Sequence, residues 1–170
     1  MHAQRTTVLA LLIAMVGLFA CKHERPEPYD LELLNLALQN GQRQWYGNAP
    51  DLLPRSSGSG HPEPYLRTRY NTIAMNDVDD DGYVEDDAVF DPGALIVKEL
   101  YDSPTHLYRY AIMYKQPGNE NADADGWVWC EVRPGGEATT PSSERGSACR
   151  GCHGGAGNID HTLMNEAFPP

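Results

Sequence analysis

The chain has 170 residues, of which 24 are aspartate or glutamate and 13 are lysine or arginine, so its formal net charge is −11. This length fits one domain with its own core. The negative charge excludes nucleic acid as an expected partner, because phosphate groups repel an acidic surface.

The first 20 residues have the composition of an export signal. Arg5 supplies a positive charge, and a nearly unbroken apolar run over residues 8–20 is short for a membrane-spanning helix. The run ends in Leu18-Phe19-Ala20-Cys21, which resembles the bacterial lipobox. We therefore expect removal of residues 1–20, a lipid on Cys21, and anchorage to a bacterial membrane, in the periplasm or at the outer membrane. Cleavage without lipidation and an uncleaved anchor are alternatives, and each also exports the chain.

The folded domain is expected to span residues 30–170. Residues 21–29 are charged and contain prolines, which predicts a lipidated tether. Asp30 is expected to cap a helix whose buried face carries Leu31, Leu34 and Leu38, and Asn40-Gly41 is expected to end it.

Four stretches of apolar, aromatic and β-branched residues predict strands, at residues 65–73, 94–101, 107–115 and 127–132. Turn formers such as Asp91-Pro92-Gly93 separate them. The fold class predicted is mainly β (α+β): an antiparallel sheet domain with a few short helices. Residues 52–64 predict a loop without evident chemistry, and a polar connector follows Gly136.

An acidic loop between the first two of these strands has the opening pattern of a calcium site. Asp77, Asp79 and Asp81 occupy alternate positions before Gly82, and Tyr83 follows. The closing glutamate is missing, because Ala88 stands at the twelfth position. A weak calcium site and a solvated acidic turn are both consistent with the pattern.

Ala148-Cys149-Arg150-Gly151-Cys152-His153 is the attachment pattern of c-type haem. Cys149 and Cys152 are spaced to bond the two vinyl groups, and His153 is placed to ligate the iron. Three alternatives compete: a thioredoxin-like redox pair, for which the chain ends too soon; a zinc site completed by two of His153, His161 and Cys130; and a strained Cys149–Cys152 disulfide.

The position of the motif near the C-terminus bears on whether the iron has a sixth ligand on the haem face opposite His153. Only 17 residues follow His153, and Met164 is close to it in sequence, so an open, five-coordinate iron is expected. Met75, Met113 and His61 are the other candidates for a sixth ligand, each more typical of core or surface.

Further features precede the motif in a fixed order: a Phe90-Asp91-Pro92-Gly93 turn, the stretch Val97-Lys98-Glu99, an apolar strand ending at Lys115, and Gly126-Trp127. With the motif they resemble the cytochrome P-460 and cytochrome c′-beta family over residues 90–168. The resemblance implies a mostly β fold that holds a high-spin c-type haem, often as a dimer.

The resemblance also indicates residues around the haem. Lys98 matches the lysine that P-460 members link covalently to the porphyrin; the alternative is an exposed strand lysine paired with an acid. Ala111 falls where hydroxylamine-oxidising members carry a carboxylate, so that reaction lacks its base here. Arg109 or Tyr110 is a candidate hydrogen-bond donor to a bound ligand.

Haem c is thus the expected cofactor, and a calcium ion in the acidic loop is a second candidate beside the solvated turn. The leading hypothesis is a haem domain that binds or oxidises nitric oxide or hydroxylamine and exchanges electrons with a soluble protein. The alternative is a six-coordinate periplasmic electron-transfer cytochrome without substrate chemistry.

Overall fold

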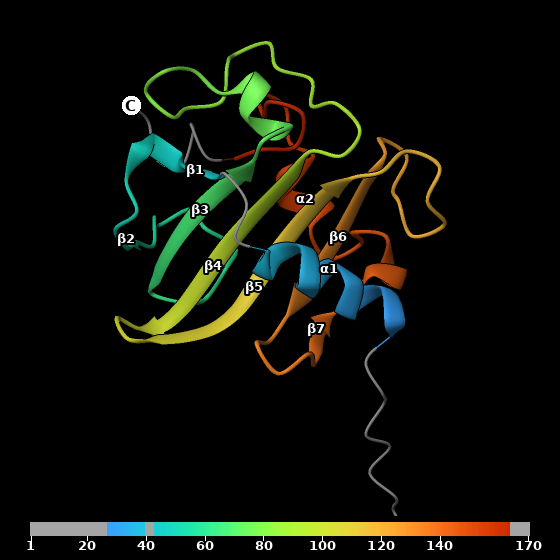
Figure 1. The fold of residues 1–170 in the computed structure, drawn as a ribbon, viewed down its shortest axis with the longest axis horizontal. Helices are drawn as coiled ribbons and strands as arrows, with labels where there is room; N and C mark the ends of the chain where they lie inside the picture. Colours follow the sequence, from blue (N-terminus) through green and yellow to red (C-terminus); the bar gives the residue numbers. More distant parts are fainter. Residues whose placement is uncertain (1–26, 40–42, 164–170) are drawn as a thin grey trace, which may run out of the picture.

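Seven strands form one antiparallel sheet in the computed structural model, which describes residues 27–39 and 43–163. Across the sheet the order is β1 (Arg43–Trp45), β3 (Tyr65–Asn71), β4 (Leu95–Ser103), β5 (His106–Lys115), β6 (Trp127–Val132) and β7 (Ala138–Thr140), and β2 (Leu53–Pro54) also pairs with β3. The four strands predicted from the sequence are β3 to β6 (Figure 1). The mainly β, antiparallel fold class is confirmed.

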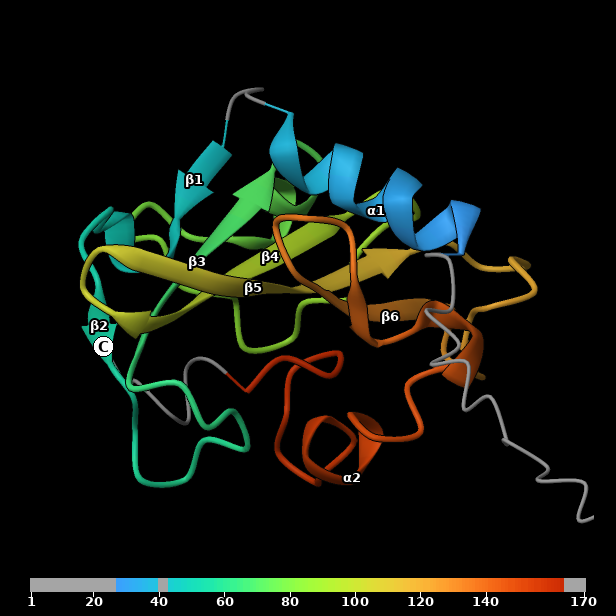
Figure 2. The ribbon, with the colours of Figure 1, turned by 90° about the horizontal axis from the view of Figure 1, so that it is seen from below.

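The two faces of the sheet carry separate cores. Helix α1 (Pro28–Leu38) covers one face, and the C-terminal segment with the one-turn helix α2 (Arg150–His153) lies across the other (Figure 2). Strand alternation produces this division, because neighbouring side chains point to opposite faces. On β4, Leu95 and Val97 pack with α1, whereas Ile96 belongs to the aromatic core on the opposite face.

The aromatic core supports the C-terminal segment. The buried rings of Phe90 and Trp127 meet edge to face at 5.7 Å, and Trp129 lies 6.5 Å from Trp127 between ring centroids. Aromatic pairs of this geometry stabilise a core beyond the area that they bury. Cys149 and Ile159 pack against this core, which thus lies beneath the C-terminal segment.

Helix α1 corrects the sequence prediction. It begins at Pro28, and Asp30 lies inside it, fully buried, where its carboxylate accepts the backbone N–H of Ser142 at 2.9 Å. Leu33 and Leu34 are buried, whereas Leu31 and Leu38 are exposed. The prediction holds for Leu34 and was wrong for Leu31, Leu38 and the capping role of Asp30. Asp30 points inward because its partner comes from a distant part of the chain, and local spacing carries no sign of that partner.

Short elements complete the fold. Three 3-10 turns of the described residues occupy Tyr46–Asn48, Ala74–Asp77 and Ser142–Glu144, and β7 lies within the predicted polar connector. The predicted signal peptide, Cys21 and Met164 lie outside the described residues, as does the tether before residue 27. Over the described ranges, no helix is both long and apolar enough to cross a membrane.

Candidate functional site

The three residues of the attachment motif lie together on α2 and the residue before it. Cys149 is half-buried and Cys152 is exposed, and the backbone N–H of Cys152 bonds to the carbonyl of Cys149 at 3.2 Å. Both cysteines are free thiols. The turn therefore presents two separate sulfur atoms one helical turn apart, as attachment to two vinyl groups requires.

The zinc alternative loses support from this geometry. Cys130 is buried on the α1 side of the sheet, where its Sγ lies 3.6 Å from the Asp30 carboxylate. Burial raises its pKa well above the usual range, so it is a poor metal ligand. Within residues 27–39 and 43–163, no three His, Cys, Asp or Glu side chains are grouped to hold a metal ion.

A cavity of about 560 Å³ lies between α2 and the sheet. Cys149, Cys152 and His153 form one wall of it, residues 56–61 of the β2–β3 loop form another, and Lys98, Arg109 and Glu131 line it from the sheet. A smaller apolar pocket of about 40 Å³ adjoins it at Ile96, Ala111 and Met113. The larger cavity falls in the size range of cofactor sites.

His153 is held as a neutral imidazole with a defined orientation. Its Nδ1 lies 2.8 Å from the carbonyl oxygen of His161, which can only accept, so the proton sits on Nδ1. Burial lowers the pKa of His153 to about 4. Its ring meets Trp129 edge to face at 5.1 Å. Nε2 is thus left with its lone pair available for a metal.

The segment that supplies this carbonyl has a constrained backbone. Asp160 and His161 both adopt positive φ angles, 39° and 69°, which L-residues rarely adopt. Asn158 reinforces the turn, since its Nδ2 donates to the carbonyls of Cys152 and His153 at 3.0 and 2.9 Å. Such strain persists only where surrounding contacts enforce it.

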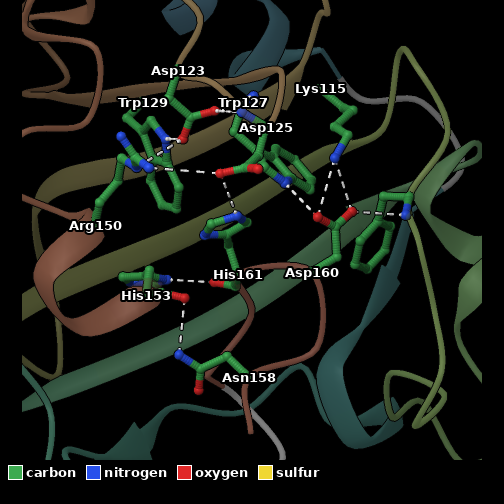
Figure 3. A network of polar contacts seen from close by, with 11 residues as sticks. Lys115, Asp123, Asp125, Trp127, Trp129, Arg150, His153, Asn158, Asp160 and His161 are labelled. Atoms are coloured by element: carbon green, nitrogen blue, oxygen red, sulfur yellow. Dashed lines mark hydrogen bonds and ion pairs between the residues drawn. The ribbon is translucent and has the colours of Figure 1, made fainter. Parts of the chain in front are cut away.

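Asp160 provides those contacts (Figure 3). Its carboxylate pairs with Lys115 Nζ at 3.0 Å and accepts Trp127 Nε1 at 3.0 Å and the Phe90 N–H at 2.9 Å. Both members of the ion pair are largely buried. The carboxylate therefore fixes the C-terminal segment to the aromatic core.

Two further carboxylates, in the loop before β6, connect that loop to α2 and to the segment after it. Asp123 accepts Trp129 Nε1 at 2.8 Å, and Asp125 lies 3.2 Å from His161 Nε2 (Figure 3). Arg150 of α2 lies 3.6 Å from the Asp123 carboxylate. Trp129 and His161, which both touch His153, are thereby held in place.

A row of four cross-strand partners, three of them polar, crosses the sheet beneath the cavity. Thr68, Lys98, Ala111 and Glu131 are consecutive cross-strand partners on β3, β4, β5 and β6. Lys98 lines both cavities, so it does not lie on an exposed face, and burial lowers its pKa to about 8. Nothing in the contacts of Lys98 tests the predicted link to the porphyrin.

The three β5 residues that were expected near a bound ligand lie on different faces of the sheet. Ala111 lines the smaller pocket and Arg109 the larger one, whereas Tyr110 packs in the α1 core. Arg109 is engaged by two carboxylates, at 2.9 Å from Glu63 and 2.8 Å from Glu131. Its guanidinium therefore orients Glu131.

Sequence reasoning missed Glu131, and it named His61 only as one of several candidates for a sixth ligand, within a loop of no evident chemistry. Glu131 is the one charged residue of β6 and is mostly buried, with its side chain 12 % exposed. A single acid within an apolar strand was the available signal, because an unpaired buried charge is costly. His61 lies 3.2 Å from Glu131, and only the tertiary structure brings the two together.

The acidic loop is stabilised by its own backbone. Asp79 Oδ1 accepts the N–H groups of Asp81 and Tyr83 at 3.0 and 2.8 Å. Burial and neighbouring carboxylates raise the pKa of Asp77. The described residues bring no cluster of ligands together here, so calcium binding stays a prediction from the sequence.

Comparisons with protein-family models, curated proteins and solved structures find no match for this chain. The function is therefore argued from the site itself.

Proposed function

We propose that this chain is a c-type haem protein that binds small nitrogen-oxide ligands, nitric oxide or hydroxylamine, at an iron held by His153. The observation that carries the proposal is the convergence of two free thiols and one oriented, neutral imidazole on a single large cavity. In this arrangement Cys149 and Cys152 would form the thioethers and His153 Nε2 would be the proximal ligand.

The residues present fit the group. The cavity is lined by both thiols and the imidazole, and the apolar residues Ile96, Ala111 and Met113 extend it over the sheet. Haem would supply an iron that takes up small ligands and exchanges electrons. The chain itself would orient the proximal imidazole through His161 and limit access of water from the sheet side.

Turnover of hydroxylamine needs a proton acceptor near the bound substrate. Ala111 offers none, and the nearest carboxylate in the row is its cross-strand partner Glu131, which is already paired with Arg109 and His61. These pairings support ligand binding over oxidation as the main role. A lipid anchor, a dimer and a soluble electron-transfer partner remain predictions.

A second candidate is the six-coordinate electron carrier. One observation favours it: His61 lines the same cavity as His153, so a second imidazole is available for the iron.

The test of haem attachment is production of the full chain in a host that matures c-type cytochromes, beside the double variant Cys149→Ala/Cys152→Ala. The wild-type protein should be coloured and gain the mass of one haem, and the double variant should carry no covalent haem. A colourless wild-type protein with polypeptide and lipid mass alone would overturn the proposal. A strongly red-shifted Soret band with one further bond at Lys98 would establish the porphyrin link.

Ligand binding is tested on the same protein by adding nitric oxide or hydroxylamine under anaerobic conditions. Binding should change the absorption spectrum with saturation. Rapid consumption of hydroxylamine would contradict the conclusion that the site lacks a base for this oxidation.

A further inference from the structure

His61 reaches the cavity from the β2–β3 loop. The loop is closed by the hydrogen bond from the Arg55 N–H to the Pro64 carbonyl at 2.8 Å, and the His61 N–H bonds to Ser59 Oγ at 3.2 Å. The side chain of His61 is 17 % exposed and lines both the large cavity and the smaller pocket. The loop therefore delivers one titratable side chain to the cavity that His153 also lines.

Both imidazoles use the same nitrogen for an outer contact. His61 Nδ1 lies 3.2 Å from Glu131 Oε1, as His153 Nδ1 lies 2.8 Å from the His161 carbonyl. A carboxylate or carbonyl that accepts from Nδ1–H fixes the tautomer whose Nε2 carries the lone pair, which is the usual arrangement behind a metal-bound histidine.

The distance between the two rings fits one metal between them. Their centroids are 6.5 Å apart, with an angle of 68° between the planes. A metal about 2 Å from each nitrogen, with each ring centre about 1 Å further, separates two opposed imidazoles by about 6 Å. A histidine that only hydrogen-bonds to a bound ligand would stand about 2–3 Å further away.

Glu131 is itself held in place. Arg109 Nη1 and Thr140 Oγ1 donate to its Oε2 at 2.8 and 3.0 Å, so Oε1 is directed to His61. The acceptor behind His61 is therefore a carboxylate that is already paired with the Arg109 guanidinium.

We propose that His61 is the second axial ligand of the haem iron in the resting protein, with Glu131 as its positioning residue. A small ligand then binds by displacing His61. The proposal rests on the proposed function because it needs the haem. The sequence led us to expect an open, five-coordinate iron, whereas this proposal gives the resting iron a sixth ligand from the protein.

The experiment compares holoprotein of the wild type with His61→Ala, Glu131→Gln and the control His106→Ala, by absorption and electron paramagnetic resonance. His106 is an exposed histidine of β5 paired with Asp102. Wild type and His106→Ala should be low-spin with signals of two histidine ligands. His61→Ala should be high-spin, and added imidazole should restore the low-spin spectrum.

Glu131→Gln tests the positioning role. It should stay low-spin, have a more positive midpoint potential because the imidazole becomes a weaker donor to ferric iron, and bind nitric oxide about 10-fold faster. A structural role alone would leave the potential and the binding rate unchanged.

A high-spin wild-type protein would overturn the proposal, as would a His61→Ala variant that stays low-spin without imidazole. If His61→Ala fails to keep haem, His61→Met provides the test instead. Its low-spin bands should take the character of histidine–methionine ligation, and bands unchanged from the wild type would overturn the proposal. Absence of covalent haem in every variant would instead refute the proposed function.

Discussion

A single hydrogen bond decides which nitrogen of His153 is available to a metal. The carbonyl of His161 accepts from Nδ1, and two strained residues position that carbonyl. Backbone strain of this kind costs about 1–3 kcal/mol per residue and is typical of functional sites. The energy is offset by the buried contacts of Asp160, so the stability of the segment and the orientation of its imidazole depend on the same carboxylate.

The three described cysteines should differ in reactivity in protein without haem. Cys152 is exposed, burial raises the pKa of Cys149 to about 11, and Cys130 is buried with a pKa raised further. Iodoacetamide should modify Cys152 first, Cys149 slowly and Cys130 only after unfolding, as measured by peptide mass mapping. Equal rates at Cys130 and Cys152 would contradict the described packing. In holoprotein, Cys149 and Cys152 should both be protected.

Asp160→Asn should destabilise the protein by about 3–5 kcal/mol, the cost of leaving one partner of a buried ion pair alone. An amide cannot neutralise Lys115, and its NH₂ group would face Trp127 Nε1 or the Phe90 N–H. Urea unfolding measures the change. Asp102→Asn, which removes an exposed carboxylate, is the control and should shift stability by less than about 1 kcal/mol. Equal effects of the two substitutions would refute the assigned role.

At the scale of elements, α2 is too short to be stable alone and depends on what it packs against. The turn before it approaches Trp129 so closely that Gly146 is required there. Gly146 has a φ of 69°, and a Cβ at this position would lie 2.3 Å from Trp129 Cδ1. The Gly146 carbonyl also accepts the N–H groups of Cys149 and Arg150 at 2.9 Å. The glycine thus sets the distance between the attachment turn and the sheet.

Gly146→Ala should therefore displace the turn and lower stability by about 1–3 kcal/mol. Gly135→Ala is the matched control, because a Cβ at Gly135 meets no atom within 4 Å and its φ is not positive. Thermal unfolding should show a lower midpoint for Gly146→Ala alone. The yield of covalent haem in the maturing host should fall with it, and an unchanged yield and midpoint would show that the turn tolerates a side chain.

Across the whole molecule, regular strands were predictable and the parts formed by distant contacts were not. The apolar run of residues 127–132 matches β6 at both ends, since period and turn residues are local signals. Strands β1, β2 and β7 have two or three residues and depend on their partners. In the site, Cys149, Cys152 and His153 were found from their spacing. Asp160, His161 and Glu131 act only through tertiary contacts, which a single sequence does not reveal.

The division into two faces predicts unequal stability. The core beneath α1 is closed by protein side chains such as Leu33 and Val128, whereas the opposite face contains the large cavity. In protein without haem, amide hydrogen exchange should stay slow in β4 to β6 and be fast in residues 147–163. Haem attachment should slow exchange in that segment selectively. Uniform protection with and without haem would contradict this view.

The contacts of Asp160 and Gly146 also imply an order of assembly. Their partners Phe90, Lys115, Trp127 and Trp129 all precede them in the chain and lie on or beside the central strands. The earlier strands can thus form a platform while the attachment turn is still extended, with both thiols accessible to the maturation machinery. Docking of the turn is then a late step, and a defect in the platform should reduce haem loading even where the motif is intact.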